Sequence, residues 1–405
     1  MYNTRHTAPP HSMKYQETHP WIQFPETPPV GSQFSPIWHL MGEVCSKIKH
    51  LADSAVPPSV HKELNRLYLI RGVQGSTAIE GNSLSEEEIG QIIDNRGPLP
   101  LSKRYQEQEI RNVVEASNQI IHDTCADNTP SLTSEYICKL NHRVLQQLEL
   151  QEDVKPGVLR THSVIVGSVY RGAPVEDCPY LMERLCTWLN SETFQAPKED
   201  YKYAMAIIQA VCAHIYLAWI HPFGDGNGRT ARLVEFYLLL KAGTPVPAAH
   251  LLSNHYNKTR SEYYLHLQKL SRKDLNDRYP NFNAFLEYAL QGLVDGLREQ
   301  IDTVQKYQHK VMWEYFVYQT FRNTKSKERG KRMRDLLLSF REGFQTIDMS
   351  SIQPEVYHNH YSKKTNRTLQ RDLRELAAMA LIEKNGNNYR PRHEIITGML
   401  PIKAN

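Results

Sequence analysis

The chain has 405 residues, of which 40% are hydrophobic and 23% are charged, and its net charge is +4 with a pI near 8.5. These values lie close to globular averages, so they argue against a disordered or fibrous chain, and the length is sufficient for two or three domains with cores of their own. The small positive charge does not by itself indicate a nucleic-acid partner.

Six cysteines are scattered without a C-x-x-C pair, which argues against a disulfide framework or a zinc knuckle and fits a reducing compartment. The first twenty residues lack the apolar run of a signal peptide, so we expect a cytoplasmic location. The long apolar run 203–220 contains Gln209 and His214, and we interpret it as a buried core helix with no membrane partner.

Helices dominate the predicted elements, so we expect a mainly α fold. Residues 1–37 are rich in Pro, His and Thr and predict an extended arm laid on or tethered to the body. Apolar residues at helical spacing follow over 35–79, and Ser85 to Glu88 match a capping box that starts a new helix near Glu86. Further amphipathic helices are predicted at 107–123, 133–148, 178–189, 202–220 and 229–242, followed by a long helical stretch over 284–321.

Two segments interrupt this helical pattern. Residues 158–176 alternate β-branched and polar side chains around two glycines, which predicts a short hairpin. Residues 324–334 are polar and basic and contain a glycine, so we predict a hinge and a domain boundary there.

Residues 221–232 read HPFGDGNGRTAR and combine groups suited to binding phosphate. Three glycines alternate with polar residues, so successive backbone N–H groups can turn toward one anion. The helix expected from Arg229 adds the positive end of its dipole. Arg229 and Arg232 can each donate a charged fork to phosphate oxygens, and two such forks favour a polyphosphate over a monoester.

Two other residues of this stretch suggest chemistry. Asp225 would repel an anion unless a cation lay between them, so we predict that it is a Mg²⁺ ligand sharing the metal with phosphate oxygens. His221 has an unperturbed pKa of about 6.5 and is suited to accept a proton as a general base. A simple glycine-rich turn is the alternative, but these residues all converge on one helix start.

HPFGDGNGRTAR resembles the HPFx[D/E]GNGRxxR signature of the Fic (filamentation induced by cAMP) family at every defined position. The resemblance covers about residues 38–300 and implies a helical Fic fold that transfers AMP from ATP to a Ser, Thr or Tyr hydroxyl of a target protein. By the same resemblance His221 is the base and Asp225 holds Mg²⁺. The residues that the resemblance assigns to phosphate binding are Gly226, Asn227, Gly228 and Arg229.

The stretch STAIEGN begins at Ser76 and places Glu80 one helical turn later, beside the helix-ending residue Gly81. Alone it reads as an exposed Glu before a C-cap glycine. Beside a Fic motif it resembles the family's inhibitory pattern [S/T]xxxE[G/N], in which the Glu pairs with the second motif arginine, here Arg232, and blocks the ATP γ-phosphate. In some relatives the same Glu serves removal of AMP from the target, and that alternative stays open.

Two further stretches resemble parts of the family. THSVIVGSV resembles the flap that lays an edge strand against the target segment. RSEYY resembles a stretch beside the base and ribose of the nucleotide, which makes Tyr263 and Tyr264 candidate ATP contacts, with core packing as the alternative. The flap residues concerned are Val164, Ile165, Val166 and Gly167.

Residues 333–392 resemble the winged helix-turn-helix module often appended to Fic proteins. Within 365–383, basic residues fall on one helix face and leucines on the other. The basic face is suited to a DNA major groove, and a solvated face on a docking or dimerisation domain is an equal alternative. The candidate DNA contacts are Arg367, Gln370, Arg371 and Arg374.

The predicted organisation is an arm (1–37), a helical region carrying the inhibitory helix (38–115), a Fic core with a hairpin flap (116–302), a linker and hinge (303–332) and a winged helix-turn-helix domain (333–405). We predict AMP transfer from ATP with Mg²⁺, restrained by the Glu80–Arg232 pair. The alternatives are a nucleotide-sensing DNA-binding regulator, a Fic-type deAMPylase and a transferase of another phosphate group. Expected partners are ATP and a target protein, with self-modification, DNA and a homodimer left open.

Overall fold

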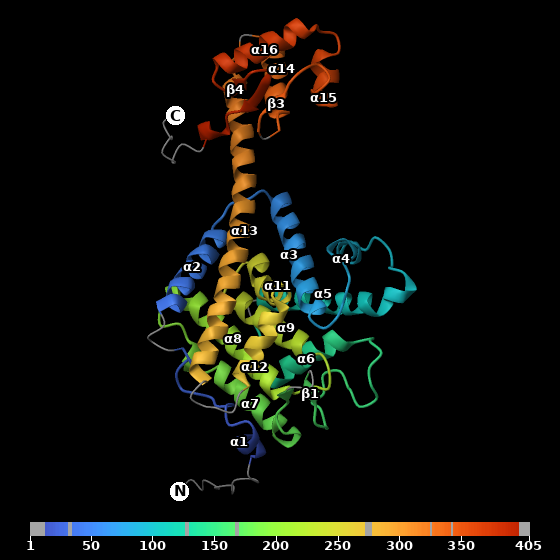
Figure 1. The fold of residues 1–405 in the computed structure, drawn as a ribbon, viewed down its shortest axis with the longest axis vertical. Coiled ribbons are helices and arrows are strands. Elements are labelled where there is room, and N and C mark those ends of the chain that lie inside the picture. The colour runs from blue at the N-terminus through green and yellow to red at the C-terminus, as the bar shows by residue number, and fades with distance from the viewer. Residues whose placement is uncertain are drawn as a thin grey trace. The chain divides into compact units, whose positions relative to one another are not determined.

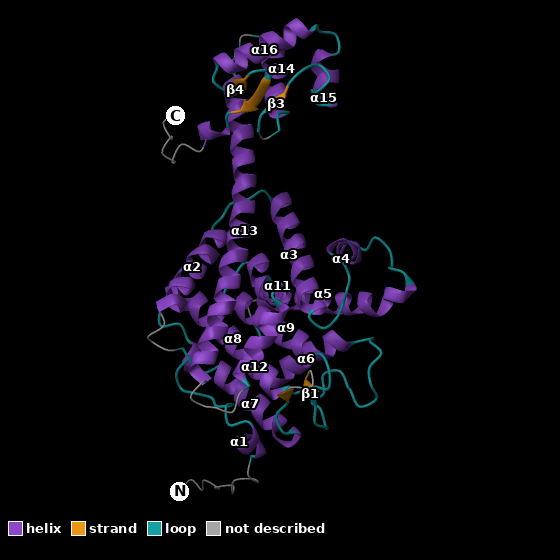
Figure 2. Cartoon of the chain, viewed as in Figure 1, coloured by secondary structure: helices purple, strands orange, loops and turns teal. Residues whose placement is uncertain are grey.

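A computed structural model describes residues 13–30, 35–125, 129–166, 170–271, 278–324, 326–341 and 343–396. The chain divides into two compact units, Met1–Ile301 and Asp302–Asn405. Helices make up most of each unit and the strands are few and short (Figures 1 and 2). The mainly α fold expected from the sequence is confirmed.

The N-terminal unit contains helices and one two-stranded hairpin. Strands β1 (Ile165–Val166) and β2 (Tyr170–Arg171) are antiparallel, with Ile165 opposite Arg171. Its helices are α1 (Lys14–Thr18), α2 (Ser35–Ala52), α3 (Pro58–Ala78), α4 (Glu86–Ile93), α5 (Arg104–Cys125), α6 (Ser134–Leu145), α7 (Cys178–Leu189), α8 (Lys202–Ile220), α9 (Asn227–Lys241), α10 (Val246–Ala249), α11 (Leu251–Lys258) and α12 (Arg260–Leu270), and α13 (Arg278–Phe321) begins in it.

Helices α8 and α9 lie side by side in the middle of this unit, joined by the HPFGDG segment (Figure 1). The stretch Glu199–Ile220 is long and apolar enough to cross a membrane by composition, but 83% of its apolar window is buried inside the protein. Helix α9 is also buried on nearly all sides, so Arg229 and Arg232 are only 3% and 2% exposed. The α8–α9 pair is therefore a core hairpin that carries charged groups inside the protein.

Local rules set the start of α4 and the packing of the arm. The Ser85 side chain accepts a hydrogen bond from the Glu88 N–H while the Glu88 carboxylate accepts one from the Ser85 N–H, so the predicted capping box is confirmed. The described part of the arm contains the short helix α1, and the residues after it lie on the unit with Trp21 and Ile22 buried.

The C-terminal unit follows the order helix, strand, helices, hairpin. Its elements are α14 (Lys327–Leu338), β3 (Gln345–Thr346), α15 (Pro354–Val356) with a π-helical turn (Tyr357–Tyr361), α16 (Asn366–Ala378), β4 (Ile382–Asn385) and β5 (Asn388–Pro391), with the sheet order β3-β5-β4. Leu369, Leu373 and Leu376 of α16 are fully buried, as their spacing predicts.

The end of α13 contributes Trp313, Val317 and Phe321 to this second core. The basic segment 324–334 contains the first turns of α14, whose Met333 is buried in the same core. Residues 303–332, which the sequence suggested as a linker, therefore fall within the compact C-terminal unit, and the division lies between Ile301 and Asp302.

Candidate active site

The loop between α8 and α9 is fixed by its own side chains. His221 ends α8 in the left-handed backbone region at φ 48°, and Gly226 precedes α9 at φ 73°. The Asn227 side chain contacts the backbone of Phe223 twice, accepting from its N–H at 3.0 Å and donating to its carbonyl at 2.8 Å. Asn227, assigned to phosphate binding by resemblance, thus also holds the loop closed.

His221 is kept neutral by its surroundings. Burial lowers the pKa of His221 to about 4. A backbone hydrogen bond with Ala218 and the charges of Glu80 and Asp225 raise this pKa, but burial outweighs them. A neutral imidazole at pH 7 has a free lone pair, which a general base requires.

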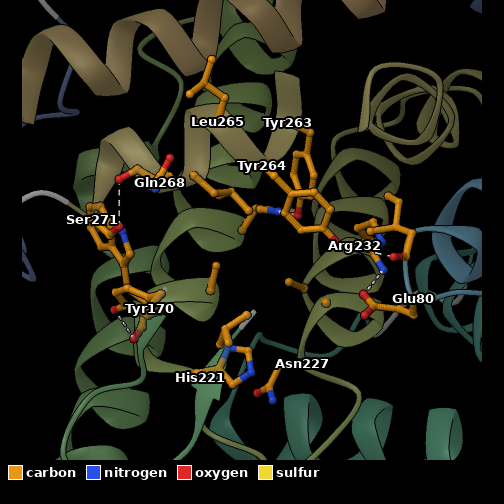
Figure 3. A pocket seen from close by; sticks show the side chains of 18 of the residues that line it. Glu80, Tyr170, His221, Asn227, Arg232, Tyr263, Tyr264, Leu265, Gln268 and Ser271 are labelled. Carbon is orange, nitrogen blue, oxygen red and sulfur yellow. Dashed lines mark hydrogen bonds and ion pairs between the residues drawn. The ribbon is translucent and has the colours of Figure 1, made fainter. Parts of the chain in front are cut away.

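A cavity of about 590 Å³ opens beside His221. Asn227, Gly228 and Arg232 of α9 line it together with His221, and Glu80 reaches it from the end of α3 (Figure 3). This volume lies in the usual range for sites that bind small molecules. The predicted base, part of the predicted phosphate cradle and the predicted inhibitory carboxylate therefore face one cavity.

Glu80 and Arg232 form an ion pair at 2.7 Å between Oε1 and Nη2. Arg232 also donates from Nε to the Ser76 Oγ at 3.1 Å and from Nη2 to the Ser76 carbonyl at 2.7 Å. Burial alone raises the pKa of the Glu80 carboxyl, but the charge and hydrogen bond of Arg232 outweigh it and hold that pKa below its usual value. The pair is therefore ionised at neutral pH.

Glycines allow this close approach. Gly81 turns the chain after α3 at φ 103°, a conformation that favours glycine. A Cβ placed on Gly228 would lie 2.2 Å from Glu80 Oε1. Glu80 therefore reaches Arg232 over the bare backbone at the start of α9.

Arg229 points to a different set of partners. Its Nη1 donates to Glu109 Oε1 at 2.6 Å and its Nη2 to Asp225 Oδ1 at 3.2 Å. Glu109 is itself buried, which raises its pKa although Arg229 opposes the shift, and its other oxygen accepts from Asn82 at 3.0 Å. The structure thus places Arg229 between two carboxylates, and Arg229 does not line the cavity described above.

Asp225 remains accessible, with 43% of its side chain exposed. Its contacts with the Gly226 N–H and with Arg229 both use Oδ1. Among the described residues no group of three or more His, Cys, Asp and Glu side chains could hold a metal ion by itself. A Mg²⁺ ion that uses one protein carboxylate and several substrate phosphate oxygens matches this donor set.

The two tyrosines of the RSEYY stretch lie differently. Tyr263 is 3% exposed and its hydroxyl lies 2.9 Å from Nε2 of His214 in a buried cluster. Tyr264 is 46% exposed and donates to the Ile79 carbonyl at 3.3 Å, next to Glu80. Both line the cavity, so packing and ligand contact are compatible roles for Tyr263 (Figure 3).

The predicted flap is the β1–β2 hairpin, and Val166 lines the cavity. The Val164 carbonyl accepts from the Gly172 N–H at 3.1 Å, and Ile165 is 59% exposed. The fourth predicted flap residue, Gly167, lies outside the described residues.

Sequence reasoning missed three buried residues that hold this site. Arg160 donates from Nε to the His221 carbonyl and from Nη1 to the His162 carbonyl, both at 2.7 Å, and it also contacts the carbonyls of Ala173 and Ile220. No local pattern marks it, because its partners are backbone atoms from other segments.

Asn141 and Glu109 are the other two missed residues. The fully buried Asn141 donates to the Asp225 carbonyl at 3.0 Å and to Thr230 Oγ1 at 3.2 Å. Asn141 lies on the buried face of α6 and Glu109 on the buried face of α5. A polar residue on the apolar face of a predicted helix is the sequence feature that could have marked them.

A model of the Fic/DOC family matches residues 131–239. This segment of the chain is similar to that family. The matched segment includes α6, the hairpin, α8, the motif loop and most of α9.

Curated relatives match a longer stretch of the chain. Protein adenylyltransferase fic-1 of Caenorhabditis briggsae is 28% identical over 233 residues, 57% of this chain and 41% of the relative. Protein adenylyltransferase Fic of Aedes aegypti is 30% identical over 206 residues, 51% of this chain and 38% of the relative. The chain thus spans about two fifths of the length of these relatives.

Solved structures share the fold. A Fic family protein from Desulfovibrio desulfuricans G20 superimposes with a TM-score of 0.53 at 20% identity, covering 90% of this chain and 98% of the other. Fic-1 from C. elegans gives a TM-score of 0.52 at 21% identity, covering 67% and 73%. The Fic fold expected from the motif is confirmed.

The predicted basic face of the C-terminal unit lies on α16. Arg367, Arg371 and Arg374 are exposed and Gln370 is half-buried. Lys363 and Lys364, just before the helix, are exposed as well. The structure therefore presents a basic surface, defined by these two lysines and three arginines.

Proposed function

We propose that this protein is a protein adenylyltransferase that transfers AMP from ATP to a Ser, Thr or Tyr hydroxyl of a target protein. One observation carries the proposal: a neutral His221 shares a cavity with the glycine-rich start of a buried helix. His221 is suited to remove a proton, and the start of the helix is suited to bind phosphates. The curated relatives are named protein adenylyltransferases.

In this reaction the target hydroxyl lies near His221, which takes its proton as the oxygen attacks the α-phosphorus. A new P–O bond forms, the bond from the α-phosphorus to the bridging oxygen breaks, and pyrophosphate leaves with the bond's electron pair. The backbone N–H groups at the start of α9 oppose the negative charge on the phosphates. The rigid loop held by Asn227 and Arg160 fixes the base relative to the phosphates.

We propose that Asp225 holds Mg²⁺ in this reaction. The carboxylate is accessible and stands beside the predicted phosphate cradle. When bound, the ion neutralises charge on the phosphate oxygens.

We further propose that Glu80 restrains the enzyme. Arg232 is nearly fully buried, and its side chain already contacts the Glu80 carboxylate and two Ser76 oxygens. A phosphate that uses the same guanidinium must displace Glu80, which leaves that carboxylate beside a polyanion. Like charges at close range disfavour this arrangement, so basal activity is low.

The test compares wild type, Glu80→Gly and Glu80→Gly/His221→Ala with Mg²⁺ and ATP labelled at either its α- or its γ-phosphate, in the presence of a cell lysate. We expect label only from the α position, strong only in Glu80→Gly and lost in the double variant. Label on the protein itself reports self-modification. Label from the γ position alone would replace AMP transfer by phosphoryl transfer.

Absence of label from both positions, with Tm unchanged by the substitutions, would contradict the proposal for ATP. The alternative of a deAMPylase is tested on lysate proteins that have first been labelled with AMP from α-labelled ATP. The release of that label is then followed. That activity would require Glu80, so Glu80→Gly would lose it.

A second function is favoured by the exposed basic surface of α16. We propose that the C-terminal unit binds DNA there, since three exposed arginines can contact phosphates or guanine edges. The test is a mobility-shift titration at several salt concentrations, with Arg371→Ala expected to reduce the slope of log K against log salt by about 1 if that residue contacts phosphate. No retention at low salt would leave docking or dimerisation as the role of this face.

A further inference from the structure

The register of the β1–β2 hairpin determines which backbone groups face outward. Gly172 donates its N–H to the Val164 carbonyl across the hairpin. Because hydrogen-bonded and non-hydrogen-bonded positions alternate in an antiparallel pair, the next position, Ile165 opposite Arg171, is non-hydrogen-bonded. The N–H and C=O groups of these two residues therefore point away from the hairpin, at its two outer edges.

The N-terminal arm covers one of these edges. His19, which is 4% exposed, lies with Nε2 at 2.8 Å from the Arg171 carbonyl. A carbonyl only accepts, so Nε2 carries the proton and donates. Its ring also packs against the ring of Tyr170 in an edge-to-face arrangement at 6.0 Å. The outward carbonyl of β2 is thus occupied by a residue of the arm.

The arm is itself firmly attached to the N-terminal unit. The Tyr15 N–H donates to Asp177 Oδ2 at 2.7 Å, just before α7, and the Pro25 carbonyl accepts from Trp188 Nε1 at 2.7 Å. Trp21 is buried and its ring lies 5.0 Å from that of His19. The ring of His19 therefore packs against both Trp21 and Tyr170, which restrains it beside the Arg171 carbonyl.

The hairpin is close to the candidate base. A Cβ on Gly172 would lie 3.0 Å from the His221 Cβ and 3.0 Å from the Arg160 guanidinium. The Tyr170 hydroxyl donates to the Trp219 carbonyl at 2.7 Å, two residues before His221. A shift of β2 would therefore change the distance between the flap and His221.

We propose that the N-terminal arm is a positioning element for the flap. His19 closes the outer edge of β2, so an extended target segment pairs with the main chain of β1 at Ile165 and not with β2. The arm also fixes the hairpin against His221. The role in target docking rests on the proposed transfer of AMP to a protein, whereas the closed edge and the fixed hairpin do not.

The first test substitutes His19 by Gln, which retains an N–H donor in place of Nε2, or by Leu, which does not. Hydrogen exchange of the Gly172 and Ala173 amides is measured in both variants, with the His221 amide at the end of α8 as the internal control. These amides donate to Val164, Trp219 and Leu217 carbonyls respectively. We expect exchange at Gly172 and Ala173 about 5- to 10-fold faster in His19→Leu, restored toward wild type in His19→Gln, and unchanged at His221.

The second test uses paired proline substitutions in the Glu80→Gly background. Ile165→Pro removes the outward N–H of β1 without removing a hairpin hydrogen bond, and Arg171→Pro does the same for β2. The substrate is the lysate protein that Glu80→Gly labels most strongly. We expect KM for that protein to rise about 10-fold in Ile165→Pro and to remain unchanged in Arg171→Pro, with KM for ATP unaffected in both. Ile165→Ala separates the loss of the side chain from the loss of the N–H.

Equal exchange in wild type and His19→Leu, or equally faster exchange at the His221 amide, would overturn the positioning role. Equal effects of the two prolines on the target KM would overturn the closed edge. If no variant transfers AMP, the proposed function fails, and the exchange measurement still decides whether the arm positions the hairpin.

Discussion

Replacement of Arg160 by methionine should both destabilise the N-terminal unit and displace His221. Arg160 is 5% exposed and makes two hydrogen bonds of 2.7 Å, to the His221 and His162 carbonyls. Hydrogen bonds from a charged donor contribute about 1.5–3 kcal/mol each, so the substitution should cost about 3–6 kcal/mol. At about 2 °C per kcal/mol for a unit of this size, the Tm should fall by about 6–12 °C.

The assay is thermal unfolding followed by circular dichroism, together with AMP transfer in the Glu80→Gly background at a temperature where every variant is folded. Arg160→Lys, which keeps the charge but not the fork, should lose about half as much stability. Arg104→Met, at an exposed position on α5, is the matched control. A Tm of Arg160→Met within about 1 °C of the control, with full transfer, would refute the reasoning.

Three other predictions follow from the site. Ser76→Ala removes the hydroxyl oxygen that accepts from Arg232 Nε. It should raise AMP transfer above that of wild type, but less than Glu80→Gly does. Activity equal to wild type would show that Ser76 does not support the Glu80–Arg232 pair. In Glu80→Gly, the acidic limb of kcat/KM against pH should lie near the pKa of about 4 that burial gives His221. It should lie no higher, because the substitution removes a negative charge that raises this pKa. A limb near 6.5 would contradict the effect of burial on His221. Glu109→Ala leaves the buried Arg229 without its closest carboxylate and should lower the free energy of unfolding by about 3–5 kcal/mol in urea titrations. The control Glu115→Ala, on the same helix, should change it little. A loss below about 1 kcal/mol in Glu109→Ala would show that Asp225 alone compensates the charge of Arg229.

Much of the local structure was determined by short-range patterns. The capping box at Ser85, the leucine face of α16 and the apolar α8 follow from rules that act over a few residues. The HPFGDGNGRTAR stretch also marks the candidate site, because its turn, glycines and helix start are contiguous. Its resemblance to the Fic signature extended that interpretation to Glu80.

The tertiary structure decided how the charged side chains pair. Arg229 and Arg232 lie three residues apart on one buried helix, yet one contacts Glu109 and the other Glu80, partners that are 120 and 152 positions away in the chain. The sequence shows that two arginines are present, but not that one lines the cavity and the other does not.

The same holds for the arm. Composition indicated an extended segment, and only the packing brought His19 to the Arg171 carbonyl of the flap. Periodicity and capping depend on neighbours along the chain, so the sequence determined the helices, the motif and the turn that carries Glu80. Burial and charge pairing depend on neighbours in space, so the partners of Arg229, Arg160 and His19 were decided only when the helices packed.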